Sequence, residues 1–249
     1  MRWIACQIVL TVALLATPAR SQDDFGLRWF NNSASMIQGY MGQAAMASVA
    51  NAQARRVARE SRRREQTPAL RERAGRENIL IVGNDRTVSR QARARFVDDL
   101  VRSQPQARPQ LEAALASDWQ AGYAREIARP NGLDPRNLAD SHAAYLIASW
   151  AVVNDVATIS PRGIAAVRDA IRADLAARPE IAQLTPAQRQ GLAEFLNYNT
   201  VLVMAQRVRI QSGDRALQAE AARHYAAQFS RQGVDLAALR LTDDGFITR

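Results

Sequence analysis

Cysteine is almost missing from this chain, and the single residue of this type is Cys6. Cys6 falls within a segment that we expect to be removed as a signal peptide, so the mature chain would carry no thiol. This excludes disulfide bonds, thiolate metal sites and a cysteine nucleophile. An exported domain of this kind is stabilised by its hydrophobic core alone, which about 150 residues or more can provide.

Lysine is missing altogether, and all 33 basic residues are arginine. A GC-rich genome explains this usage without any function, because arginine codons are GC-rich and lysine codons are not. The net charge of +9 is unevenly distributed: the segment from Arg55 to Arg95 holds thirteen arginines against five acidic residues. Any attraction to anions is therefore expected to be local to this segment.

Glycine is sparse, with 12 residues, and the alternating runs of Val, Ile, Thr and Tyr that indicate strands are nearly absent. Alanine is abundant instead. It is the best helix former, because its side chain loses no rotamer entropy when the backbone becomes ordered. The composition predicts an all-α protein, and a hydrophobic content of 47% is enough for a core.

The N-terminus has the organisation of an export signal. A short positive start precedes an uncharged, mostly apolar stretch over 4–15, and Pro18 follows it. The small residues Ala19 and Ser21 then occupy the positions that a signal peptidase reads. We expect a signal peptide over 1–21, cleaved after Ser21 or after Ala19, and hence a periplasmic or secreted protein with no transmembrane span after cleavage. An uncleaved membrane anchor is the alternative, although the apolar run is short for a helix that spans a bilayer.

Residues 22–84 differ in composition from the rest of the chain. The stretch 31–54 is uncharged and rich in small residues and glutamine. It predicts either a helix that packs on the domain or on a second copy of itself, or a flexible alanine-rich tether. The sequence then becomes strongly basic, at Arg55, Arg56, Arg59, Arg62, Arg63 and Arg64. The β-like run Ile79–Val82 near the end predicts a short strand or a segment that docks on the core.

The globular part is expected over 85–249, as a bundle of about six helices. An N-cap side chain followed by proline marks three of the helix starts: Asp134-Pro135, Ser160-Pro161 and Thr185-Pro186. The cap oxygen accepts a backbone hydrogen bond, and proline has no N–H to leave unpaired. The expected helices cover 87–104, 108–129 with a bend near 117–118, 135–155, 161–178, 186–211 and 214–231. A turn sequence at 242–245 predicts a short extended segment near the C-terminus.

The stretch 138–153 is apolar nearly all round, which is typical of a helix buried on every side. We expect it at the centre of the bundle, with 186–211 as the next most buried helix. Five polar and aromatic residues at the central helix are candidates for a functional site or a polar core: Asn137, Asp140, His142, Tyr145 and Trp150. The aromatic side chains on apolar faces are better explained as core packing. If the domain has a ligand pocket, it would lie among a wider set of aromatic and asparagine side chains, which includes Trp119, Tyr123, Asn197, Tyr198 and Asn199.

No residue pattern identifies catalytic chemistry. Adjacent helical side chains point about 100° apart, so Asp140, Ser141 and His142 cannot act on one another as a triad. The two histidines, His142 and His224, have no carboxylate–histidine pattern that indicates a metal site, and we expect neither a metal nor a cofactor. No spacing selects a general acid–base pair from the acids near apolar stretches: Asp118, Glu126, Asp140, Asp155, Asp169 and Glu194.

The segment Asn137-Leu138-Ala139-Asp140, with Tyr145 and Trp150 after it, resembles the central motif of an uncharacterised family of secreted bacterial all-α proteins, a domain of unknown function. The C-terminal residues Gly233-Val234-Asp235 and Gly245-Phe246 are similar to the end of the same family. The resemblance covers about 85–247 and leaves the basic N-terminal stretch outside it. It implies a helical, exported protein and no particular activity.

Three hypotheses of function follow. The first is an exported, non-enzymatic envelope protein with an interaction or structural role, which contacts itself or an envelope partner through 31–54. The second is binding of an anionic polymer or membrane surface through Arg55–Arg95, because guanidinium groups pair well with phosphate and carboxylate; a solvated basic linker is the plain alternative. The third is a hydrolase, which would need Asp140, His142 or Glu126 in a cleft.

Overall fold

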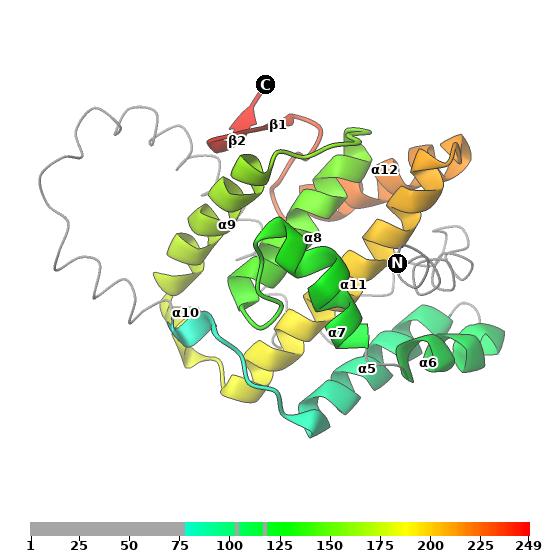
Figure 1. Ribbon diagram of the computed structural model, residues 1–249, viewed down its shortest axis with the longest axis vertical. Coiled ribbons are helices and arrows are strands. Elements are labelled where there is room, and N and C mark those ends of the chain that lie inside the picture. Colours follow the sequence, from blue (N-terminus) through cyan, green and yellow to red (C-terminus); the bar gives the residue numbers. More distant parts are fainter. Residues whose placement is uncertain (1–77, 103–104, 117–118) are drawn as a thin grey trace, which may run out of the picture.

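The computed structural model describes residues 78–102, 105–116 and 119–249. In these residues the chain is all-α, as predicted, with eight α-helices and a small C-terminal sheet (Figure 1). The signal peptide, the stretch 31–54 and Arg55–Arg64 lie outside the described residues. The helices are α5 (Arg86–Val101), α6 (Arg108–Ala116), α7 (Trp119–Tyr123), α8 (Leu138–Val153), α9 (Pro161–Ala176), α10 (Pro179–Gln183), α11 (Pro186–Gln211) and α12 (Arg215–Ser230).

The helix expected over 108–129 is divided into several elements. Helix α6 ends at Ala116 and α7 begins at Trp119, and the bend expected near 117–118 falls on residues outside the described ones. A π-helical turn (η4, Ala124–Ala128) and a 3-10 turn (η5, Arg129–Asn131) then complete the segment. Gly132 ends it in the left-handed conformation with φ 69°, which glycine adopts without strain. The short helix α10 was not predicted.

Two of the three predicted N-caps are confirmed. The Ser160 side chain caps α9, and Thr185 forms a capping box with Gln188 at the start of α11. The prediction that α8 starts at Pro135 is wrong, because its N-cap is Asn137 and the helix begins at Leu138. Asn137 has extended backbone angles and forms an isolated antiparallel bridge with Ile81. A residue paired in this way cannot belong to a helix.

The run Ile79–Val82 docks on the core and forms no regular strand. Its first residues complete a 3-10 turn (η2, Asn78–Leu80). Leu80 and Val82 are buried in the hydrophobic core, and the Val82 N–H donates to the Arg136 carbonyl at 2.8 Å. The core therefore includes residues that precede Asp85.

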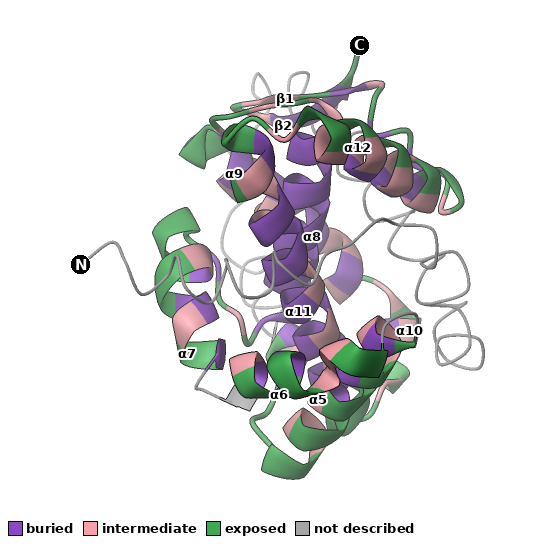
Figure 2. Ribbon diagram, turned by 90° about the vertical axis from the view of Figure 1, so that its right-hand side faces the viewer, coloured by how far each residue is buried: buried purple, intermediate pink, exposed green. Residues whose placement is uncertain are grey.

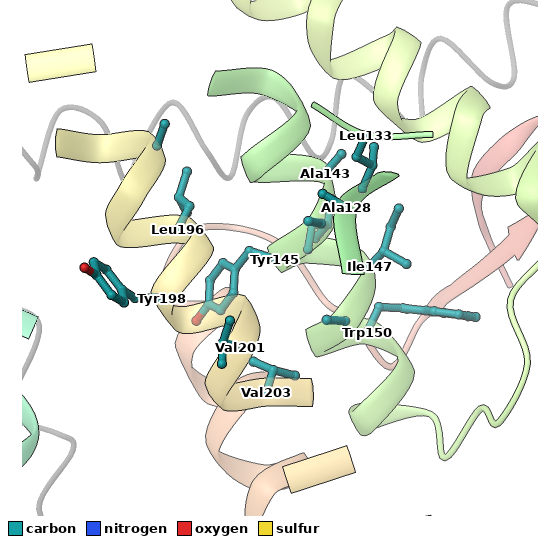
Figure 3. Close-up of a cluster of buried hydrophobic side chains, with 14 of the residues drawn as sticks. Ala128, Leu133, Ala143, Tyr145, Ile147, Trp150, Leu196, Tyr198, Val201 and Val203 are labelled. Carbon is teal, nitrogen blue, oxygen red and sulfur yellow. The ribbon is translucent and has the colours of Figure 1, made fainter. Parts of the chain in front are cut away.

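Helix α8 lies at the centre of the molecule, as its apolar sequence predicts, and α9, α11 and α12 pack around it (Figure 1). Every residue over 138–152 is buried, which Figure 2 shows as a continuous buried helix. Helix α11 contributes the facing layer, in which Leu196, Val201 and Val203 lie beside Tyr145 of α8 (Figure 3). The two most buried helices are the two that the sequence indicates.

The C-terminal residues form an antiparallel hairpin of β1 (Leu239–Thr242) and β2 (Gly245–Thr248), as the turn sequence predicts. The hairpin packs on α8 and α9. Trp150 of α8 donates from its indole Nε1 to the Leu239 carbonyl at 3.1 Å, and its ring meets the Phe246 ring edge-on.

Candidate functional site

The five candidate residues at α8 lie in separate local environments. Asn137 uses its side-chain oxygen to cap the helix, accepting from the N–H groups of Ala139 and Asp140. The Asp140 carboxylate is fully buried and receives Nε and Nη2 of Arg172, each at 2.6 Å. It also accepts from the Asp134 N–H at 2.8 Å. Asn137 therefore caps α8, and Asp140 ties the helix to α9 and to the loop before it.

His142 is buried, and neither ring nitrogen has a hydrogen-bond partner within the described part of the chain. Burial, followed by the positive charge of Arg178, lowers the pKa of His142 to about 4. The imidazole is therefore neutral at pH 7, and it is packed as an apolar ring.

Tyr145 and Trp150 are core residues. Burial raises the pKa of Tyr145 to about 12, and its ring packs on Phe229 at 5.6 Å between centroids. Trp150 holds the C-terminal hairpin. In Figure 3 the two side chains leave α8 in different directions, Tyr145 toward α11 and Trp150 away from it.

The three residues named for the hydrolase hypothesis lie in separate environments. Glu126 lies on the η4 turn, where its side chain is 42% exposed and pairs with Arg125 at 2.6 Å. Asp140 is engaged by Arg172, and His142 has no polar partner in the described residues. None of these three residues lines the cleft that is described next.

A cleft of about 750 Å³ lies between the N-terminal end of α5, the α7–η5 segment, the loop before α8 and α11. This volume is in the range of small-molecule sites. We call its buried lining residues the floor: Val82, Trp119, Tyr123, Ala124, Leu133, Glu194 and Asn197. We call its exposed arginines the rim: Arg86, Arg90, Arg129 and Arg136.

Helix α11 places the polar part of the floor. Gln190, Glu194 and Asn197 are spaced by four and three residues, which brings their side chains to one helix face. One Glu194 oxygen, Oε1, accepts from Ser89 Oγ at 2.6 Å and from Gln190 Nε2 at 2.9 Å. The Asn197 amide donates from Nδ2 to the Pro135 carbonyl at 3.0 Å. The floor therefore connects α11 to α5 and to the loop before α8.

Two acceptor atoms of the floor lack a partner. Glu194 Oε2 and Asn197 Oδ1 are buried, and neither receives a hydrogen bond in the described part of the chain. No ion pair among the described residues includes Glu194. Buried polar atoms in proteins nearly always have a partner, and buried carboxylates nearly always have a compensating charge.

Aromatic rings form one side of the floor. Trp119 stacks on Tyr198 at 3.9 Å between centroids, and Tyr198 stacks on Phe96 at 4.7 Å. Burial, with a smaller contribution from the Glu194 carboxylate, raises the pKa of Tyr198 well above its usual value, so this ring stays neutral. The stack fixes Trp119 as a flat apolar surface.

Some floor residues were within reach of sequence reasoning. Three of them, Trp119, Tyr123 and Asn197, belong to the aromatic and asparagine set that marks where a ligand pocket would lie. Glu194 is one of the acids near apolar stretches. The sequence does not predict the rim residues Arg129 and Arg136. It also does not predict Ser89 and Gln190, the two donors to Glu194. The one available signal is the helical spacing of the polar residues Gln190, Glu194 and Asn197, which indicates a polar strip on α11.

Among the described residues, no helix is long and apolar enough to cross a membrane. These residues contain no group of three or more histidine, aspartate or glutamate side chains that could hold a metal ion.

No curated protein and no solved structure gives a significant match to this chain. One family model does match, over residues 2–249, and its description is a family of unknown function, DUF6683. The match is longer than the 85–247 expected from the resemblance, and it takes in the basic N-terminal stretch. Since it spans nearly the whole sequence, the chain belongs to the DUF6683 family of unknown function.

Proposed function

We propose that this protein is an exported, non-enzymatic binding protein of the cell envelope, and that it captures an anionic group with the arginine rim of the cleft. The observation that carries the proposal is the gathering of four arginines around one cleft. Within the described residues, no carboxylate forms an ion pair with Arg86, Arg90, Arg129 or Arg136.

The charge balance of the rim supports an anionic ligand. Asp134 is the one acidic residue exposed in the cleft lining, and its carboxylate already accepts from the Arg136 backbone N–H at 2.9 Å. Guanidinium groups present planar pairs of donors that fit phosphate and carboxylate oxygens. Arg86 and Arg90 also belong to the segment Arg55–Arg95, so the rim extends the electrostatic hypothesis to a defined place in the fold.

Pyrophosphate is a suitable first probe, because it is compact and carries several negative charges. We expect it to raise the thermal unfolding midpoint of the mature protein, with a smaller rise as sodium chloride is added. The double variant Arg86→Ala/Arg136→Ala should lose most of the rise. The double variant Arg223→Ala/Arg240→Ala is the charge-matched control, because both arginines are exposed, on α12 and β1, and neither lines the cleft. An unchanged midpoint in the wild type, or an equal rise in the double variant, rejects the proposal.

Export rests on the N-terminal sequence. Production of the full chain in a bacterial host should give a mature protein that begins after Ser21 or after Ala19. Intact mass spectrometry of the envelope fraction reads this directly, and a chain that still starts at Met1 contradicts cleavage.

Self-association through 31–54 is a second candidate, favoured by the uncharged, small-residue composition of that stretch. Light scattering after size-exclusion chromatography would compare the mature protein with Gly39→Leu/Gly42→Leu. A dimer that dissociates in the variant supports a helix–helix contact at small residues. A monomer in both cases counts against it.

A further inference from the structure

Glu194 is the one buried charged residue in the described cleft lining, and no cation pairs with its carboxylate among the described residues. It is 6% exposed, two neutral donors occupy Oε1, and Oε2 has no partner among the described residues. A carboxylate without a cation is costly to bury, because the protein interior replaces little of its hydration. The floor therefore favours a positively charged group.

Asn197 indicates which kind of positively charged group fits the floor. Its Oδ1 is a second buried acceptor without a partner, and it lies on the same face of α11 as Glu194. Of the buried side-chain atoms that lack a partner in the described chain, these two are the ones on residues that line the cleft. A primary ammonium group carries three donors and one positive charge, so it can serve both acceptors. A divalent cation would require more ligands than this floor provides.

The other surfaces of the cleft indicate what the rest of the ligand is. The arginines of the rim suit a carboxylate at the solvent end of the cleft. Besides Glu194 and Asn197, the floor offers an apolar wall, formed by Val82, Leu133 and the Trp119 ring. A ligand that meets all three surfaces is small and zwitterionic, with an apolar side chain.

On this basis we infer that the cleft binds an α-amino carboxylate with an apolar side chain, as a free amino acid or a short peptide, with its ammonium group at Glu194 and Asn197 and its carboxylate at the arginine rim. The inference rests on the proposed function, because it assigns the anionic group captured by the rim to one end of a zwitterion. It adds a cation-binding end to the same site.

Isothermal titration calorimetry with four probes tests the inference on the mature protein at pH 7: leucine, leucyl-leucine, N-acetyl-leucyl-leucine and leucyl-leucine amide. We expect the unmodified dipeptide to bind at least tenfold more tightly than its acetylated form, which lacks the ammonium, and than its amide, which lacks the carboxylate. Tighter binding of leucine assigns free amino acids, and tighter binding of leucyl-leucine assigns peptides. Either result supports the inference.

The variant Glu194→Gln keeps the shape of the side chain and removes its charge. It should reduce the preference for the free amine over the acetylated peptide from at least tenfold to about one. Glu126→Gln, an exposed position outside the cleft lining, should keep the full preference. A preference that survives in Glu194→Gln overturns the assignment of the ammonium group to this carboxylate.

A second measurement uses only the wild type and so does not depend on the folding of a variant. The α-amino group of a peptide titrates near pH 8, so raising the pH from 7 to 9 should weaken binding of leucyl-leucine about tenfold. Binding of the acetylated peptide should change far less, which controls for titration of the protein.

The results distinguish failure of the inference about the floor from failure of the proposed function. Equal binding of the free and acetylated dipeptides overturns the inference about the floor and leaves the anion-binding rim in place. Binding of pyrophosphate without binding of any leucine probe has the same meaning. If neither pyrophosphate nor any leucine probe binds, the proposed function fails as well.

Discussion

Gln190 and Asp85, 105 residues apart in the sequence, exchange two hydrogen bonds as paired peptide groups do. The Asp85 N–H donates to Gln190 Oε1 at 2.9 Å, and Gln190 Nε2 donates to the Asp85 carbonyl at 2.9 Å. The same Nε2 also reaches Ser89 Oγ and Glu194 Oε1. One amide therefore fixes the N-terminal end of α5 on α11 and orients the carboxylate of the cleft floor.

Replacement of Gln190 by leucine should lower the free energy of unfolding by about 1–3 kcal/mol, because backbone groups of Asp85 and one donor to Glu194 lose a buried partner. Urea denaturation measures the change. Gln211→Ala, at an exposed position near the end of the same helix, is the control and should change stability by less than about 0.5 kcal/mol. Equal stability of the two variants contradicts the role of Gln190 as a clamp.

Substitution of Arg172 should lower the free energy of unfolding more than substitution of an exposed arginine. Arg172→Leu leaves the fully buried Asp140 carboxylate without its cation, and such a loss destabilises proteins by about 3–5 kcal/mol. Arg162→Leu is the matched change, because Arg162 is 86% exposed and approaches Asp243 only to 4.0 Å. Its effect should be within about 0.5 kcal/mol. Chemical denaturation of both variants makes the comparison.

The buried His142 side chain should make the stability depend on pH. Its folded-state pKa of about 4 lies below the value of about 6.5 for an unfolded chain, so the unfolded state binds the proton first. Its contribution is constant above pH 6.5, falls between pH 6.5 and 4 by about 3 kcal/mol, and is constant again below. His142→Leu should flatten this part of the wild-type profile, while carboxylates that titrate in the same range affect both proteins.

The same variant tests the unpartnered ring at neutral pH. Leucine has a similar volume and no polar atoms to leave unsatisfied, so His142→Leu should be as stable as the wild type or more stable at pH 7. A loss of more than about 2 kcal/mol at pH 7 would show that the ring nitrogens have partners in solution. Thermal unfolding between pH 4 and 8 provides both readouts.

Replacement of two helical glycines by alanine should change the stability in opposite directions. A Cβ at Gly163 of α9 would lie 2.8 Å from the Thr242 carbonyl oxygen, so Gly163→Ala must displace the hairpin and should cost about 1–3 kcal/mol. A Cβ at Gly191 of α11 would meet only Val88, at 3.9 Å. Gly191→Ala should stabilise by about 0.5–1 kcal/mol, because alanine loses less backbone entropy in a helix. Denaturant titrations decide the signs.

Sequence features that act over a few residues predict much of the fold. Alanine content and the apolar run over 138–153 predicted a helical protein with α8 at its centre, and proline after a capping side chain located the starts of α9 and α11. These features act within a few residues of one another, which is why they are legible in a single sequence. The start of α8 was misplaced because Asn137 is held in an extended conformation by Ile81, a partner 56 positions away in the chain.

The sequence by itself determined the fold class, the order of the main helices and which of them are most buried. Only the tertiary structure decided which polar residues meet. Asp140 and His142 are two positions apart on one helix, yet one pairs with Arg172 and the other packs in the apolar core. The sequence shows Glu194 as one of several acids near apolar stretches and selects none of them. The contacts with Ser89 of α5 and Gln190 place it in the cleft floor. Such neighbours come from distant segments, and their side-chain partners are set by packing geometry that no local periodicity encodes.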